Sequence, residues 1–104
     1  MEIKLFDKNI SDFIADLDKT TMAKALRTLD LLEKFGNKLS MPHSKNIGDQ
    51  LFELRIHGKK EVRLIYCFDN NKVIILHGLI KKSQKTPKRH IKLAKKHMNS
   101  IDLI

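Results

Sequence analysis

Three apolar segments, set close together in the second half of the chain, limit the possible folds most strongly. They cover residues 51–57, 61–68 and 72–80, and they are rich in Leu, Ile and Val, which fit β-strands. The breaks between them read HGKKE and FDNNK, whose Gly, Asp and Asn residues are typical of tight turns. The pattern therefore predicts three antiparallel strands joined as a meander.

Helical periodicity precedes these strands. Between residues 10 and 35, apolar residues recur at three- and four-residue spacing, which places them on one face of a helix. The positions are Ile10, Phe13, Ile14 and Leu17, followed by Met22, Ala25, Leu26, Leu29 and Leu32. Thr20 or Thr21 is suited to cap the second helix, and Gly36 is suited to end it. We expect two amphipathic helices joined as a tight hairpin.

The remaining segments add shorter elements. The opening EIKLF alternates weakly and fits a short strand, whereas residues 37–50 have no periodicity and are typical of a loop. Pro87 suits the first turn of a last helix capped by Thr86. The apolar stripe of that helix consists of Ile91, Ala94, Met98 and Ile101. The expected fold class is α+β, with an N-terminal two-helix hairpin packed on a small antiparallel sheet and a C-terminal helix, in one domain over residues 1–104.

Positive charge is concentrated in the second half of the chain. The net charge is +9, yet residues 1–50 hold eight acidic and eight basic residues, whereas residues 51–104 hold four acidic and thirteen basic residues. This asymmetry favours a polyanionic partner, nucleic acid first and an acidic protein second, because summed positive potential attracts phosphate. A basic surface that is merely solvated is the alternative.

Several other classes of protein fit the sequence poorly. No apolar stretch is long enough for a membrane span, and the start MEIKLFDKNI lacks the pattern of a signal peptide, so we expect a cytoplasmic protein without a membrane partner. The lone Cys67 lies in an apolar run and indicates core packing. The histidines show no ligand-like grouping on one element, and no glycine-rich phosphate loop is present. We therefore expect neither a metal nor another cofactor.

The two strand turns decide which side chains share a face of the sheet. If the first turn has three residues, Arg55 pairs with Arg63. If the second turn also has three, Arg63 pairs with His77, and Lys81 continues the same face. A two-residue Asn-Asn turn is the alternative, and it would shift the second pairing by one and turn His77 toward the core. The first register predicts a row in which the opposed arginines need an anion, a carboxylate or water between them.

This row is suited to cleaving RNA without a metal. The 2′-OH attacks the adjacent phosphate once its proton is accepted and the developing charge is stabilised. Arg55 and Arg63 are the first candidates for phosphate and transition-state contacts, since a guanidinium binds two phosphate oxygens at once. Lys81 and Lys82 are candidates to assist them. His77 is a candidate general acid or base, because the reference pKa of histidine, about 6.5, lies near neutrality; a structural histidine is the alternative.

A second basic cluster follows the strands. The segment KKSQKTPKRHIKLAKK holds eight Lys or Arg in sixteen residues, a density suited to phosphate backbones rather than to sequence readout. Its candidate RNA-binding residues are Lys85, Lys88, Arg89, Lys92, Lys95 and Lys96. The alternatives are a solvated helix face and docking onto a structured, RNA-rich particle.

The amino-acid sequences of these segments resemble those of a known family. The resemblance is carried by LFELRI, EVRLIYCF, VIILHGLIKKSQKTP and RHIKLAKK, whose order and spacing are similar to the HigB-like, phage-derived branch of the RelE/ParE toxin superfamily. It covers nearly the whole chain. It implies a type II toxin that cleaves mRNA on the ribosome, inhibits translation and is neutralised by a cognate helix-turn-helix, HigA-like antitoxin. The HigB arrangement with several active-site histidines is not evident, so the resemblance assigns no individual roles.

Two other functions remain open from the sequence. The same superfamily fold includes ParE-like poisons of DNA gyrase that cleave no RNA, and fold alone does not decide function. A catalytically silent nucleic-acid-binding domain is the third possibility. The basic row on the sheet and the KKSQKTP segment favour the endoribonuclease.

Overall fold

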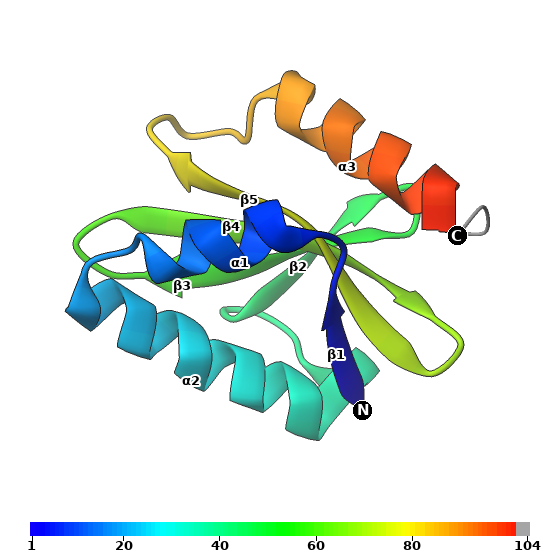
Figure 1. Cartoon of the computed structure of the whole chain (residues 1–104), viewed down its shortest axis with the longest axis horizontal. Coiled ribbons are helices and arrows are strands. Elements are labelled where there is room, and N and C mark those ends of the chain that lie inside the picture. The colour runs from blue at the N-terminus through cyan, green and yellow to red at the C-terminus, as the bar shows by residue number, and fades with distance from the viewer. Residues whose placement is uncertain (102–104) are drawn as a thin grey trace.

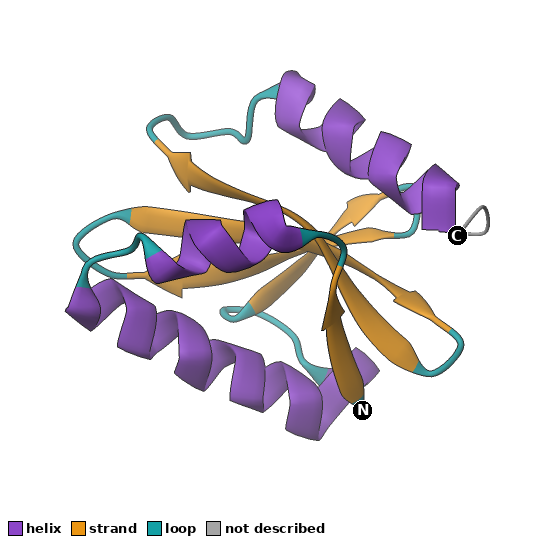
Figure 2. Ribbon diagram, in the orientation of Figure 1, coloured by secondary structure: helices purple, strands orange, loops and turns teal. Residues whose placement is uncertain are grey.

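A five-stranded sheet lies between two layers of helices (Figure 1). The computed structural model describes residues 1–101. In chain order the elements are β1 (Glu2–Leu5), α1 (Lys8–Ala15), α2 (Lys19–Phe35), the 3-10 helix η1 (Gly36–Lys38), β2 (Ser44–Gly48), β3 (Leu51–His57), β4 (Glu61–Asp69), β5 (Lys72–Lys81) and α3 (Lys88–Ser100). Helices α1 and α2 cover one face of the sheet, and α3 covers part of the other (Figure 2). The expected α+β class is confirmed.

The sheet is larger and more mixed than the expected antiparallel meander. Its strand order is β1-β5-β4-β3-β2, with β1 parallel to β5 and the other neighbours antiparallel. The expected loop over residues 37–50 contains the edge strand β2. Its sequence, SKNIG, has almost no apolar alternation, so backbone pairing with β3 defines it instead. A hydrogen bond of 2.5 Å between the hydroxyls of Ser44 and Tyr66 anchors its start.

The N-terminal helices differ from the expected hairpin in their caps and in their packing. Asp7 and Asp18, rather than Thr20 or Thr21, accept hydrogen bonds from backbone N–H groups in the first turns of α1 and α2. Helix α1 packs chiefly on β5 and α2 on β3, so each helix contacts the sheet more than it contacts the other. A strand followed by two helices spread over the sheet therefore replaces the predicted closed hairpin. Gly36 ends α2 with a φ of 54°, as expected.

The first strand hairpin has the predicted register, whereas the second does not. Arg55 in β3 lies opposite Arg63 in β4, as expected. Between β4 and β5, Asn70 and Asn71 form a two-residue turn in which both φ angles are positive, 48° and 62°. Asn tolerates this left-handed conformation, and two positive φ angles match the twist of a hairpin. The three-residue turn predicted for this hairpin is wrong.

A β-bulge in β5 restores the facing that the shorter turn changes. Leu76 is the extra residue, because the register shifts by one at this point. Beyond the bulge Arg63 lies opposite Leu79, so the predicted pairing of Arg63 with His77 is wrong. Lys81 nevertheless shares a face with Arg63, as predicted, because the bulge compensates for the residue missing from the turn.

Each face of the sheet has its own apolar core. Strand residues on one face pack against α1 and α2, and those on the other, including the buried Cys67, pack against Ala94 of α3. Helix α3 begins at Lys88, one residue after Pro87. Thr86 does not cap it, because its hydroxyl is bound to Glu53 on the sheet. Among residues 1–101, no helix has the length and apolar character needed to cross a bilayer.

Candidate active site

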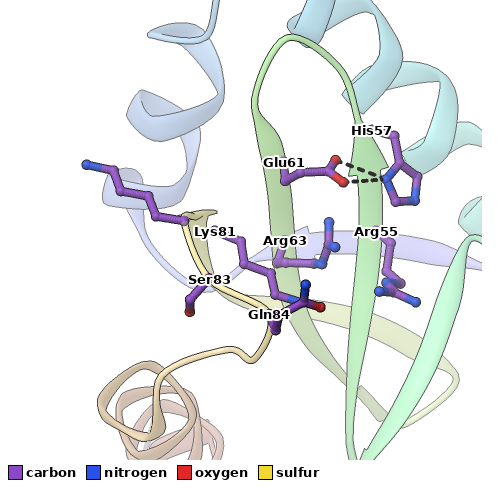
Figure 3. A pocket seen from close by; sticks show the side chains of 8 residues that line it. Arg55, His57, Glu61, Arg63, Lys81, Ser83 and Gln84 are labelled. Carbon is purple, nitrogen blue, oxygen red and sulfur yellow. Dashed lines mark hydrogen bonds and ion pairs between the residues drawn. The ribbon is translucent and has the colours of Figure 1, made fainter.

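An open pocket lies where β3 and β5 end, β4 begins and the loop to α3 starts (Figure 3). Its volume is about 440 Å³. The lining residues are Arg55, His57, Glu61, Arg63, Lys81, Lys82, Ser83 and Gln84. Four of these are Lys or Arg and one is a carboxylate, so positive charge dominates the pocket.

Two cross-strand rows of side chains form most of this pocket. One row contains His57, Glu61 and Lys81, because His57 lies opposite Glu61, and Glu61 lies opposite Lys81. The adjacent row contains Arg55 and Arg63. Side chains directly opposite each other in an antiparallel pair have Cβ atoms about 5 Å apart. Strand pairing therefore brings charged groups from three strands into one site.

The paired arginines share one buried carboxylate. Oε1 of Glu53 lies 3.4 Å from Nε of Arg63 and 3.9 Å from Nε of Arg55, and Glu53 is 4% exposed. This is the kind of group that the opposed arginines were predicted to require. Arg63 is 2% exposed, and burial lowers its pKa while the Glu53 carboxylate raises it. With a side chain 22% exposed, Arg55 is the more accessible guanidinium.

The loop between β5 and α3 connects this pocket to a second one. Thr86 Oγ1 donates a hydrogen bond of 2.5 Å to Oε2 of Glu53, which ties the loop to the sheet. The second pocket, of about 370 Å³, extends toward β2 and α3 and shares Arg55, Lys81 and Gln84 with the first. Partial burial and a nearby guanidinium charge lower the pKa of Lys81. Together the two pockets form a continuous surface, here called the cationic groove.

A histidine and a carboxylate are hydrogen-bonded at the hairpin end of the first pocket (Figure 3). Nδ1 of His57 lies 2.9 Å from both carboxylate oxygens of Glu61. This hydrogen bond lowers the pKa of Glu61, which keeps the carboxylate ionised at neutral pH. An ionised carboxylate only accepts hydrogen bonds, so Nδ1 carries a proton, and in the neutral form of the ring Nε2 is the nitrogen with the free lone pair.

His77 lies outside the pocket, contrary to the predicted row. Its Nε2 atom is 2.8 Å from Nδ1 of His90 on α3, and the two rings stack with centroids 5.0 Å apart. Burial lowers the pKa values of both His77 and His90. His97 also contacts β5, with Nδ1 at 2.8 Å from a backbone carbonyl oxygen. These three histidines hold α3 on the sheet, which agrees with the structural alternative for His77.

The other predicted cations occupy several different environments. Lys81 and Lys82 line the first pocket, and Lys85 and Lys88 line the second. Lys95 forms an ion pair with Asp49. The remaining candidates are exposed on α3 and line neither pocket: Arg89, Lys92 and Lys96.

Glu53, Glu61 and His57 are the site residues that sequence reasoning missed. A signal for all three was present, because the register of the first hairpin places His57 opposite Glu61 and puts Glu53 on the same face as the arginines. No such signal exists for Thr86. Its contact with Glu53 depends on the path of the loop after β5, which strand periodicity does not specify.

A small α+β protein with a cationic groove at one end of its sheet is of a class suited to binding a polyanion. Among residues 1–101, no three His, Cys, Asp or Glu side chains are grouped to hold a metal ion. Residues 12–99 match the family described as "Phage derived protein Gp49-like (DUF891)", and the chain belongs to this family, which is of the RelE/ParE-like toxin type. No curated protein matches the chain. The resemblance to RelE/ParE toxins is confirmed at this level, and the HigB-like branch stays a prediction.

Proposed function

We propose that this protein is the toxin of a type II toxin-antitoxin system and that it cleaves mRNA on the ribosome. One observation carries the proposal: Arg55 and Arg63 face each other around Glu53, in an open pocket that also contains Lys81 and Lys82. Membership of a RelE/ParE-like toxin family supports the role of toxin. The HigB-like branch and a helix-turn-helix, HigA-like antitoxin as partner belong to the same proposal.

The charge balance of the pocket supports binding of a phosphodiester. The two guanidinium groups share a single carboxylate, that of Glu53, and so keep an excess of positive charge. Lys81 and Lys82 add further positive charge, whereas Glu61 is engaged by His57. Attack of the 2′-OH builds negative charge on the phosphate oxygens. Fixed cations therefore stabilise the transition state more than the ground state, which is the condition for catalysis.

The lining of the pocket supports cleavage of a strand that another particle presents. Within the described residues it contains no Phe, Tyr or Trp, and Phe52, Tyr66 and Phe68 belong to the core beneath α1 and α2. Proteins that hold single-stranded RNA unaided usually stack bases on aromatic side chains. A site that offers charge without stacking agrees with a substrate positioned by the ribosome.

The proposal is tested by mapping 5′ ends on two copies of one transcript, one with and one without its start codon, after the protein is induced. We expect new ends in the translated copy only. Arg55→Ala is expected to abolish them, because it removes the accessible guanidinium. Arg27→Ala removes the same charge from the exposed surface of α2, outside the pocket, and is expected to leave them unchanged.

Each alternative function predicts a different outcome. DNA damage after induction, with no new ends in the translated copy, would overturn the proposal in favour of a ParE-like gyrase poison. Neither cleavage nor DNA damage, with RNA binding retained, would indicate a silent nucleic-acid-binding domain. Equal cleavage of both copies would contradict ribosome dependence.

A further inference from the structure

The contact between His57 and Glu61 is more specific than that of two solvated surface side chains. The imidazole contacts both oxygens of one carboxylate through Nδ1, although the His57 side chain is 54% exposed. Both residues line the pocket that contains Arg55 and Arg63. The carboxylate fixes the tautomer of the ring, so the nitrogen left to act as a base is Nε2.

The backbone that carries His57 is held on its other side by α2. Lys24 Nζ donates a hydrogen bond of 3.0 Å to the carbonyl oxygen of His57. The next residue, Gly58, packs so closely on Thr21 that a Cβ placed there would lie 2.8 Å from Oγ1 of Thr21. The hairpin turn therefore has no room to move toward α2. A base needs this restraint, because proton transfer requires a fixed position relative to the substrate.

We infer that His57 is the general base of the RNA cleavage proposed above, and that Glu61 orients it. This inference rests on the proposed function. Lys81, opposite Glu61 in the same cross-strand row, is the general acid. The base and the acid then lie on two different strands, with the row of Arg55 and Arg63 beside them to bind the phosphate.

The reaction needs no other reactant. Nε2 of His57 takes the proton of the 2′-OH while the 2′ oxygen forms a bond to phosphorus. The bond from phosphorus to the 5′ oxygen breaks, and that oxygen takes a proton from the Lys81 ammonium. The products are a 2′,3′-cyclic phosphate and a 5′-hydroxyl end. The imidazolium and the neutral lysine then exchange a proton through water, which restores both groups.

Other bases near the arginines are less suitable. Glu53 is buried, and its two oxygens face Arg55, Arg63 and Thr86. His77 lies outside the pocket, with its Nε2 atom bound to His90. The imidazole of His57 is accessible from the pocket and has a free nitrogen. The charged groups that line the pocket with it are Glu61 and Arg63 on β4, Arg55 on β3, Lys81 on β5 and Lys82 just after β5. Lys24 on α2 binds the backbone carbonyl oxygen of His57 from the other side.

The test measures single-turnover cleavage of mRNA on preformed ribosome complexes between about pH 5 and pH 8, the range in which a histidine changes charge. For the wild type we expect a rate that falls toward acid pH, as general-base catalysis by a histidine requires. His57→Gln is expected to lower the rate about 100-fold and to abolish its decrease toward acid pH (the acid limb). The half-saturating protein concentration is expected to stay unchanged. Lys60→Gln, an exposed change in the same turn, is the matched control and is expected to keep both the wild-type rate and the acid limb.

Glu61→Gln provides an independent readout. The amide can still accept a hydrogen bond from Nδ1 but removes the negative charge beside the imidazolium that forms in the transition state, so the rate is expected to fall about tenfold. In the double variant with His57→Gln, the loss is expected to equal that of His57→Gln alone.

The outcomes separate this inference from the proposed function. Wild-type rates and an unchanged acid limb in His57→Gln would overturn the assignment of the base while the nuclease activity stands. Additive losses in the double variant would overturn the role of Glu61. Cleavage products that carry a 5′-phosphate would contradict 2′-OH attack. A wild-type protein that leaves translated mRNA intact would instead overturn the proposed function itself.

Discussion

The two ends of one sheet face are built from the same strands but serve different purposes. At one end, α3 covers Ile65, Cys67 and Leu76, and the interior is apolar. At the other end, α3 has not yet begun, and the same face presents Arg63 and Lys81 to an open pocket. Alternation within a strand does not distinguish these ends, because all these side chains point to the same side. The path of the chain after β5 decides which of them is covered.

The β-bulge lies at the boundary between the two ends. Ile74 before the bulge and Leu76 within it face α3. Beyond the bulge, His77 and Lys81 share that face although their numbers have the opposite parity. Without the extra residue, the two-residue turn would turn Lys81 toward the apolar core under α2. One inserted residue thus allows a short turn and a correctly facing lysine in the same strand.

Removal of Arg63 is expected to have the largest effect, because it affects both stability and activity. Arg63→Ala leaves the buried Glu53 carboxylate without its closer partner, so we expect a loss of about 3 kcal/mol in the free energy of unfolding. Cleavage should fall by at least about 100-fold at temperatures where the variant is folded. Urea unfolding and single-turnover cleavage measure the two losses.

A double variant separates the two contributions of Arg63. Arg63→Met combined with Glu53→Leu removes both charges of the buried pair and is expected to recover most of the stability but none of the activity. Arg27→Ala, on the exposed surface of α2, is the control for loss of one positive charge. Full activity in the double variant would show that the open end does not require its paired arginines.

The covered end is expected to respond in stability alone. Leu76→Ala removes a fully buried side chain beneath α3 and leaves a cavity, which should lower the free energy of unfolding by about 3 kcal/mol. The cleavage rate of the folded variant should stay close to that of the wild type. A large loss of rate with little loss of stability would contradict the separation of the two ends.

The sequence predicts which arginines and which lysine share a face at the open end, although part of the strand register behind that prediction is wrong. The register of the first hairpin follows from the sequence because HGKKE admits one simple turn, which places Arg55 opposite Arg63. Lys81 was placed on the right face because two errors cancelled: the second turn is one residue shorter than predicted, and the bulge adds one residue. The shorter turn and the bulge both shift the register of His77 in the same direction, so His77 lies opposite Ile65 instead of Arg63.

Other features could not be predicted because they depend on contacts distant in sequence. Strand β2 has too little apolar alternation to be recognised, and its pairing with β3 is a tertiary contact. The cap of α2 is Asp18 rather than a threonine, a choice between adjacent good acceptors. Glu53 gains its role only when Thr86 approaches from the loop before α3.

The histidines at the covered end are expected to make stability depend on pH. Burial lowers the pKa values of His77 and His90 below the ordinary 6.5, so the unfolded chain binds more protons at mildly acid pH. Their contribution to stability is therefore fully present above pH 6.5 and is lost as the pH falls through the lowered values. Urea midpoints at about pH 7.5 and about pH 5.5 test this.

His90→Gln retains a hydrogen-bonding side chain beside His77 but removes one of the two titrating rings. We expect its urea midpoint to change less between the two pH values than that of the wild type. His43→Gln, an exposed change away from α3, is expected to keep the wild-type dependence. Equal pH dependence in all three proteins would show that α3 is not held by the neutral histidine pair.

The outer face of α3 is expected to give the smallest effect, because its exposed lysines line neither pocket. Lys92→Ala combined with Lys96→Ala should raise the half-saturating protein concentration a few-fold and weaken its dependence on salt, since these lysines contribute long-range attraction to phosphate. The single-turnover rate at saturation should not change.

Lys19→Ala combined with Lys38→Ala removes the same charge from the exposed N-terminal half and should change neither quantity. A lower saturated rate in the α3 variant would place part of the chemistry on the helix, and the catalytic site would then no longer be confined to the strand ends and their loop.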